Sequence, residues 1–503
     1  MRRIAGVLVV VGVFGCGDNP ASVPDAPVGA ADAPEIAVTA ECHELEAPSA
    51  TPFATGADFS PATPGSLAGW SPDGRWFLTG VRVGPSSFHF AQSGSAIVID
   101  RDAENPGTID DTEIFQRTAF EREGSSYVVA RRVSNRLSDG SLRAERAVCD
   151  GSSCRVCTAR LIRAERNAGE GESSGISLLS EFAPATWDDG ITFNVRVLGT
   201  LAYVIRGDGL HIVETADPAN PVEVGHYQRT GDGYSNDVKL VETATKRYAL
   251  IADFPVDVVD VTDPTAPVLA LQIPQDAHTL AVEQRDNKVY AYFGNYDGTC
   301  PIYDVTNPAA PQKLGSYTSP GSIVHDLSVE NGVAYLNAWE GGFVAVDYAN
   351  PAQPQLVGRW ADTPTATSHS NWTTTVGGRH IAIHGEETFG AHLNVVDIDP
   401  ASPTFMQPIG EWKTRDWVSI HNLMAFGSKA YFTHYQDGIR VLDLSDPTAP
   451  TQLGYFNTWD PQADYATSAF FEGAVGLDVD LTRKLIFVAD TPRGLLILRD
   501  ATP

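Results

Sequence analysis

Short runs of alternating apolar and polar positions recur from about Ile191 to Pro503. The run VDVVDV, from Val256, is one example, and its period of two with β-branched residues predicts a β-strand. An Asp or Asn then stands before a Pro, and a second Pro follows three residues later. The first step opens a tight turn, and the second Pro marks the entry to another strand because it cannot donate into a central ladder.

This strand–turn–strand pattern is an internal repeat. The Pro of the Asp/Asn-Pro step has a spacing of 43 to 49 residues and falls at Pro218, Pro264, Pro308, Pro351, Pro400 and Pro447. Two more strands are expected upstream of each copy, and a truncated seventh copy, GLLILRDATP, ends the sequence. Four strands at this period are typical of a propeller blade. We predict an all-β protein with a seven-bladed β-propeller of four-stranded antiparallel blades over residues 171–503.

The seventh unit stops where its fourth strand should begin, which would leave an unpaired sheet edge. The segment GISLLSEFA, residues 175–183, precedes the first unit and has the pattern of the missing strand. We therefore predict that residues 175–183 pair with the strand around Leu495 to Leu498 and close the ring.

Residues 45–170 do not follow the repeat. Stretches such as WSPDGRWFLTGVRV and SAIVIDRDAENPG read as strands linked by turns. The region is either a separate β-domain or one or two degenerate blades, and we favour an accessory β-rich domain.

The N-terminus is a candidate export signal. Arg2 and Arg3 precede an apolar run from Ile4 to Phe14 that is too short to span a bilayer, so residues 1–15 are predicted to be a signal peptide. The following Val-Phe-Gly-Cys resembles the lipobox of bacterial lipoproteins, which implies that Cys16 carries a lipid; a plain secretory signal is the alternative. Residues 16–44, rich in Ala, Pro and Asp, are predicted to be a disordered tether.

The charge and the signal together limit the partners and the location. A net charge of −28 repels phosphate backbones, so no nucleic-acid partner is expected. We expect an exported monomer that is anchored to a membrane by its N-terminal lipid, at the outer membrane or cell surface rather than the inner membrane.

Five cysteines remain besides Cys16. Cys149 and Cys154 flank the turn DGSS, so a hairpin there would bring them within disulfide reach, and Cys42 and Cys157 are further disulfide candidates. A metal site using Cys149, Cys154 and Cys157, with Cys42 or His43 as fourth ligand, is the alternative. An exported protein meets oxidising conditions, which favours disulfides.

The repeat resembles that of a known family. The closest stretches are SIHNLMAFGSKAYFTHYQDGIRVLDLSDPTAPTQLGYF and ADTPRGLLILR, which are similar to the LVIVD repeat family of bacterial and archaeal surface propellers. The resemblance implies a propeller at the cell surface. It implies no reaction, because it brings no catalytic motif.

Aligning the units places four histidines at the start of the innermost strand: His278, His325, His369 and His421. Loops that should reach the same face add carboxylates, of which Glu340, Glu386 and Asp437 are the candidates. One interpretation is that each imidazole locks a turn by hydrogen bonding to a neighbouring group. The other is a site at the channel mouth for a metal ion or an anionic ligand.

The sequence contains none of the common nucleophile, phosphate-loop or zinc-protease motifs, so no catalytic residue is predicted. We expect a lipid-anchored, non-catalytic binding module for a protein or glycan at the loop face. No cofactor is predicted beyond a metal ion that the channel could hold. The alternative function is a metal-dependent hydrolase that uses the histidines and carboxylates at the channel mouth.

Overall fold

The computed structural model describes residues 41–46, 52–59, 67–79, 87–100, 102–122, 124–150, 153–187, 190–229, 235–388, 391–463, 465–466 and 471–503. All of them belong to one compact unit, Val38–Pro503. The predicted signal peptide, Cys16 and the tether up to residue 40 lie outside the described residues. The predicted tether extended to residue 44, whereas residues 41–44 belong to strand β1 (Glu41–Glu46).

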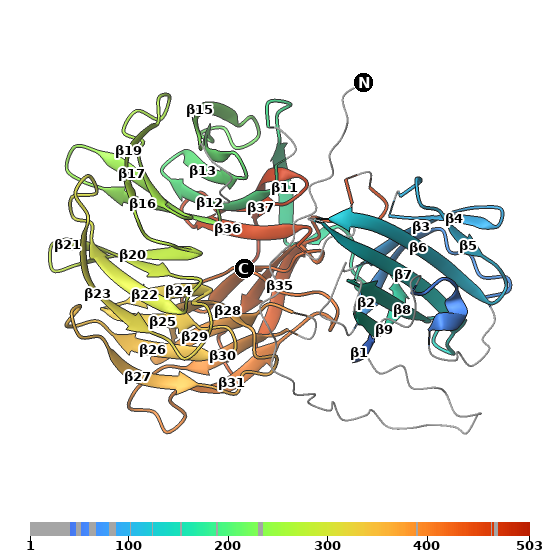
Figure 1. Cartoon of the computed structure of the whole chain (residues 1–503). Coiled ribbons are helices and arrows are strands. Elements are labelled where there is room, and N and C mark those ends of the chain that lie inside the picture. The colour runs from blue at the N-terminus through green and yellow to red at the C-terminus, as the bar shows by residue number, and fades with distance from the viewer. Residues whose placement is uncertain are drawn as a thin grey trace. The chain divides into compact units, whose positions relative to one another are not determined.

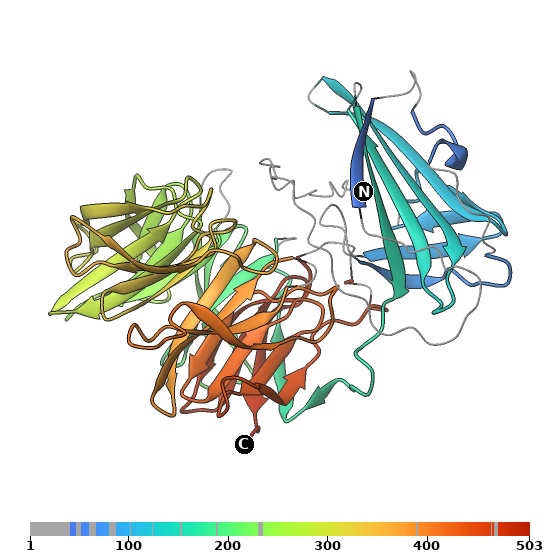
Figure 2. The same ribbon diagram turned by 90° about the horizontal axis from the view of Figure 1, so that it is seen from below.

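Residues 41–163 form a barrel. Its strands are β1, β2 (Gly74–Thr79), β3 (Ser87–Ser93), β4 (Ala96–Ile99), β5 (Gly107–Ile109), β6 (Glu113–Arg122), β7 (Ser125–Arg136), β8 (Leu142–Cys149) and β9 (Ser153–Arg163). Strands β2 to β9 pair in chain order, and β9 also pairs with β2, which closes the sheet on itself (Figure 2). Strand β1 pairs with the other part of the same β9 edge. The accessory region is thus a barrel rather than further blades.

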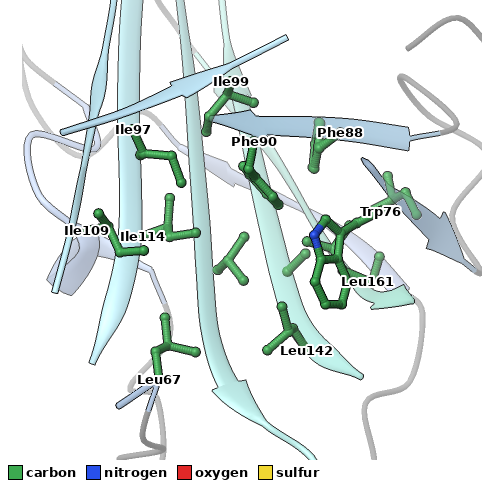
Figure 3. Close-up of a cluster of buried hydrophobic side chains, with 14 of the residues drawn as sticks. Leu67, Trp76, Phe88, Phe90, Ile97, Ile99, Ile109, Ile114, Leu142 and Leu161 are labelled. Carbon is green, nitrogen blue, oxygen red and sulfur yellow. The ribbon is translucent and has the colours of Figure 1, made fainter. Parts of the chain in front are cut away.

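The barrel interior is built from alternate residues of its strands. Figure 3 shows Trp76, Phe90, Ile114 and Leu142 among the side chains of this core, each at most 5% exposed. Because successive strand residues face opposite sides, one apolar set fills the inside. The described residues include one helical element, the short 3-10 turn η1 (Gly56–Asp58), and none of their helices is long and apolar enough to cross a membrane.

All four cysteines predicted as disulfide candidates are bonded in the barrel. Cys149 pairs with Cys154 across the β8–β9 hairpin, and Cys42 of β1 pairs with Cys157 of β9. The prediction of disulfides is confirmed, and the alternative of a cysteine metal site is wrong because these sulfur atoms are bonded to one another. Cys300 is free and buried.

The remainder folds as the predicted seven-bladed propeller (Figure 1). Blade one is β12 (Thr192–Leu198), β13 (Leu201–Arg206), β14 (Gly209–Glu214) and β15 (Val222–Gln228). Blade two is β16 (Asp237–Glu242), β17 (Arg247–Ala252), β18 (Val256–Asp260) and β19 (Val268–Ile273). Blade three is β20 (Thr279–Arg285), β21 (Lys288–Gly294), β22 (Thr299–Asp304) and β23 (Gln312–Thr318). Blades four and five are β24 (Asp326–Glu330), β25 (Val333–Asn337), β26 (Phe343–Asp347) and β27 (Gln355–Trp360); and β28 (Ser368–Val376), β29 (Arg379–Glu386), β30 (Leu393–Asp397) and β31 (Gln407–Trp412).

The last two blades each include a strand from the start of the propeller. Blade six is β32 (Leu423–Phe426), β33 (Lys429–Thr433), β34 (Ile439–Asp443) and β35 (Thr451–Phe456), with β10 (Ser173–Ser174) on its edge. Blade seven is β36 (Ala474–Asp480), β37 (Leu485–Asp490) and β38 (Gly494–Asp500), completed by β11 (Ile176–Phe182). Strand β11 pairs antiparallel with β38, with Leu178 opposite Leu498 and Phe182 opposite Leu495. The predicted closing strand is confirmed.

The innermost strands β12, β16, β20, β24, β28, β32 and β36 contact one another in this order, and β36 contacts β12. The repeat explains why neighbouring blades fit. A Cβ atom on Gly315 of β23 would lie 1.9 Å from the carbonyl oxygen of Pro351, in the turn of the next blade, and Gly225 approaches Pro264 in the same way. Each of these fourth strands therefore carries a glycine where the following Asp/Asn-Pro turn comes closest.

Candidate metal centre at the propeller channel

The four predicted histidines lie in one continuous row. His278 precedes β20, His325 precedes β24, His369 is the second residue of β28, and His421 lies shortly before β32. Successive imidazole centroids are 4.1, 4.2 and 4.5 Å apart. Because adjacent innermost strands start at the same level of the ring, the repeat brings these side chains together as the sequence predicts.

A carboxylate, Glu387, lies against three of these imidazoles. Its Oε2 atom is 3.7 Å from Nε2 of His369 and 3.9 Å from Nε2 of His325, and its Oε1 atom is 3.8 Å from Nε2 of His421. The hydroxyl of Tyr435 donates a hydrogen bond to the same Oε1 atom. One nitrogen each of His325 and His369 and one Glu387 oxygen therefore lie within 4.8 Å of one another, and His421 faces the other oxygen of the same carboxylate.

The hydrogen bonds of His421 fix the state of its ring. Its Nδ1 atom is 2.9 Å from the carbonyl oxygen of Val475, an acceptor, so Nδ1 carries the proton and donates. The lone pair is therefore on Nε2, the atom that faces Glu387. An imidazole whose other nitrogen donates to a backbone carbonyl is the usual form of a metal-ligating histidine.

His325 and His369 differ from a turn-locking histidine. Within the part of the chain that the structure describes, neither ring nitrogen of His369 has a hydrogen-bond partner. The Nδ1 atom of His325 has none there either. His369 is 1% exposed, and leaving buried polar atoms unpaired is unfavourable. The indole of Trp339 stacks on His325 with a centroid distance of 4.8 Å, which holds that ring in place.

His278 forms the edge of the row. Its Nδ1 atom lies 3.0 Å from the amide nitrogen of Asn236, which can only donate, and 2.8 Å from the hydroxyl of Tyr296. This nitrogen is therefore an acceptor with partners of its own. For His278 the structure matches the interpretation of an imidazole bonded to neighbouring groups.

Electrostatics keeps these imidazoles neutral. Burial lowers the pKa of His278 and of His421 to about 4 each. Burial, followed by the neighbouring imidazoles, holds the pKa of His325 and of His369 well below the usual value. Neutral imidazole is the form that binds metal ions, so at neutral pH no proton has to leave before a metal binds.

The three carboxylates predicted for this site make other contacts. Glu386 accepts hydrogen bonds from the backbone N–H groups of Thr365 and Thr367, and exposed Glu340 accepts from Ser322. Asp437 accepts from Thr414 and Arg415. Burial raises the pKa of Asp437, but the charges of Arg415, His434 and Arg440 and the hydrogen bond from Arg415 together outweigh it and lower that pKa to about 2. The carboxylate that lies against the imidazoles is instead Glu387, the neighbour of predicted Glu386.

A second group of histidines lies in blade one. His211 has Nε2 3.0 Å from Asp208 and Nδ1 2.5 Å from Glu223, and Nε2 of His226 is 3.5 Å from Asp208. The His211 and His226 rings stack at 4.0 Å. Because both nitrogens of His211 already have carboxylate partners, this group is satisfied as an ion-pair network. The channel cluster is the stronger candidate for a metal.

Comparison with known proteins agrees with the repeat. The family model for the LVIVD repeat matches residues 189–229, 232–273, 321–362 and 422–458, which correspond to blades one, two, four and six. No curated protein matches the chain.

Solved propellers are similar at low identity. The WD40 β-propeller domain of Doa1 has a TM-score of 0.48 at 11% identity and covers 65% of this chain and 97% of its own. Saccharomyces cerevisiae Sqt1 has a TM-score of 0.46 at 11% identity, and the match covers 67% of this chain and 100% of Sqt1. BamB from Moraxella catarrhalis has a TM-score of 0.40 at 11% identity, and the match covers 61% of this chain and 83% of BamB. Likeness at this level does not bear on function.

Proposed function

We propose that this protein is an exported, lipid-anchored propeller that acts as a binding module, and that its binding site is a divalent transition-metal ion held at the channel. The ligands are His325, His369, His421 and Glu387. The observation that carries the proposal is the approach of three neutral imidazole Nε2 atoms to one carboxylate at 3.7 to 3.9 Å.

The distances suit a metal better than hydrogen bonds. A hydrogen bond between an imidazole nitrogen and a carboxylate is about 2.7–3.2 Å long, so contacts of 3.7 to 3.9 Å are too long. Ligand atoms on one tetrahedral zinc ion, with bonds of about 2.0–2.1 Å, lie roughly 3.3 Å apart. A small inward movement of these side chains would therefore complete a site of the kind that His and Glu form with zinc and related ions.

The site is also open to a ligand from outside. The side chains of His325 and His421 are 15% and 18% exposed, whereas those of His369 and Glu387 are nearly buried. A carboxylate or hydroxyl of a bound protein or glycan could approach from the exposed side and enter the coordination shell. This is how the metal would serve the binding of a partner at the loop face.

Metal analysis of the full chain tests the proposal. We expect one zinc ion per chain after equilibration with Zn²⁺ and dialysis. His369→Asn should weaken Zn²⁺ binding, measured by competition with a chromophoric chelator, by at least about 100-fold, because losing a ligand exceeds the 10- to 100-fold effect of losing a residue that supports one.

His278→Asn is the matched control, since blade two already carries Asn236 at this place in the repeat. We expect this variant to keep its zinc within a few-fold of the wild-type affinity. A wild-type chain that retains no zinc, or equal losses in both variants, would show that the cluster is not a metal site.

A metal-dependent hydrolase is the second candidate. With His325, His369 and Glu387 as ligands and His421 outside the coordination shell, a zinc ion would keep a fourth position for water and lower the pKa of that water towards neutrality. The exposed side of the cluster and the Tyr435 hydroxyl beside Glu387 favour this function. The zinc-loaded protein would then hydrolyse 4-nitrophenyl acetate or bis(4-nitrophenyl) phosphate faster than free Zn²⁺ at the same concentration, and His369→Asn would not. Equal rates for the protein and free Zn²⁺ would rule out the hydrolase and leave the binding module as the proposed function.

A further inference from the structure

Two arginines face the inside of the N-terminal barrel. Across β6, β7 and β8, Gln116 is opposite Arg131, and Arg131 is opposite Arg146. Each lies two residues along its strand from a member of the buried core: Ile114, Val133 and Ala144 respectively. Because residues two apart in a strand share a face, the side chains of Gln116, Arg131 and Arg146 point to the same interior as that core.

The two guanidinium groups are poorly neutralised. Arg131 donates from Nη1 to Oε1 of Gln116 at 2.6 Å, and its guanidinium lies 5.5 Å from the centroid of the Phe88 ring. The carboxylates that favour its charged form are those of Asp100 and Asp102. Arg146 makes no hydrogen bond or ion pair to any residue that the structure describes, and its Nε atom is buried without a partner. Burial, and then the charge of Arg131, lower the pKa of Arg146 to about 10.

Such an arrangement is unfavourable in the protein alone. A charge removed from water without an opposite partner destabilises the fold, and a second positive charge directly opposite adds repulsion. The barrel nevertheless holds both arginines in register on adjacent strands. An anion between them would satisfy both guanidinium groups, which match an oxyanion with paired N–H donors.

The strands continue past the arginines as an apolar rim. On the same face, the next positions of β6 and β7 are Thr118 and Val129, followed by Phe120 and Tyr127. The rings of Phe120 and Tyr127 stack at a centroid distance of 5.6 Å, and Phe120 is 42% exposed. On the core side of Arg146, a hollow lined by Leu78, Phe88 and Ala144 has a volume of about 10 Å³, enough for one water molecule, so the apolar part of a ligand would have to lie towards the rim.

We propose that the barrel binds an organic carboxylate, with the carboxylate between Arg131 and Arg146 and the apolar part against Phe120 and Tyr127. This site uses neither the propeller nor its metal. It gives the chain a second, small-molecule binding function.

The test uses the full chain, with benzoate as the probe and benzyl alcohol as its uncharged counterpart. Hydrogen–deuterium exchange of peptides from β6 to β8 reports on the barrel alone, and calorimetry gives the affinity. We expect benzoate to slow exchange in these peptides and benzyl alcohol to have no effect. Arg146→Gln and Arg131→Gln should each weaken benzoate binding by about tenfold or more, the effect of losing one charge-assisted interaction.

Arg136→Gln is the control, because Arg136 is an exposed residue of the same strand β7, and it should bind benzoate normally. The free proteins separate binding from a structural role. Because Arg146 lacks a partner, Arg146→Gln should leave exchange in the free barrel unchanged or slower. Faster exchange in the free variant, no protection by benzoate, or protection by inorganic phosphate but not by benzoate would overturn the proposal.

Discussion

Buried imidazoles in this propeller differ in what their nitrogens contact, and that difference separates structural histidines from candidate ligands. His384, in β29, is fully buried, with Nε2 2.8 Å from the hydroxyl of Ser368. The rings of Phe343 and Trp360 lie 5.2 and 5.3 Å from it. His384 therefore packs between blades four and five, whereas His369 faces a carboxylate with neither nitrogen hydrogen-bonded to a described group.

The buried state of His384 predicts a pH dependence of stability. Burial lowers its pKa to about 3, whereas an unfolded chain has a histidine pKa of about 6.5. Above pH 6.5 neither state binds the proton. As the pH falls below 6.5 only the unfolded state gains it, so the free energy of unfolding falls by up to about 1.4 kcal/mol per pH unit.

Denaturant unfolding of the metal-free protein at pH 7.5 and pH 5 measures this effect, with His384→Gln as the comparison. The variant should be less stable at pH 7.5 but should lose less stability between the two pH values. Identical losses in both proteins would mean that His384 does not contribute to the acid sensitivity.

The residue scale also shows how far the sequence predicts the site. The four histidines could be found because a repeat puts equivalent residues at equivalent positions of neighbouring strands. Choosing Glu387 over Glu386 could not be done in this way, since Glu386 is the last residue of β29 and Glu387 follows it directly. The backbone N–H groups of Thr365 and Thr367 hold the Glu386 carboxylate away from the imidazoles. Arg131 and Arg146 carried no signal, because only the register of β7 and β8 makes them neighbours.

At the scale of elements, strand β11 closes the ring of blades. It supplies the outer strand of blade seven, and its first residue, Ile176, is 3% exposed in a cluster with Leu496 and Leu498. Without β11 the edge of β38 would be unpaired at the point where the first and last blades meet. The sequence predicts this pairing because an incomplete final unit and a spare strand pattern can only be reconciled by closure.

Ile176→Asp tests the closure. Burying a carboxylate in place of an apolar side chain should reduce the free energy of unfolding by about 2–5 kcal/mol and lower the melting temperature of the propeller. Hydrogen exchange should become faster in peptides that contain β38. Ser177→Asp is the control, because Ser177 is the exposed neighbour in the same strand. Equal effects of the two substitutions would argue against a closing role for β11.

The whole molecule combines a repeat architecture with a barrel that has no repeat. The propeller could be predicted because the first six blades repeat the same order of strands and the same Asp/Asn-Pro turn, although the innermost strand varies from four residues in β32 to nine in β28. The barrel strands range from three residues in β5 to twelve in β7, so no period in the sequence predicts their number or their closure. Even there the cysteine spacing predicted the Cys149–Cys154 link, since a four-residue turn leaves the flanking residues opposite each other.

The two disulfides of the barrel support the proposal that the chain is exported, because such bonds persist in oxidising compartments. If the N-terminal signal is of the lipoprotein type, Cys16 carries two or more acyl chains, and two chains are enough for stable membrane anchoring.

Expression in a bacterium that is fed an alkyne-tagged fatty acid tests the lipid anchor. The wild type should be labelled and sediment with membranes, whereas Cys16→Ser should be unlabelled and soluble after export. Cys300→Ser, which removes the buried free thiol, should behave as the wild type. Labelling of Cys16→Ser at the wild-type level would refute the anchor. Loss of the label in Cys300→Ser alone would mean that the lipid is attached to Cys300 and not to Cys16.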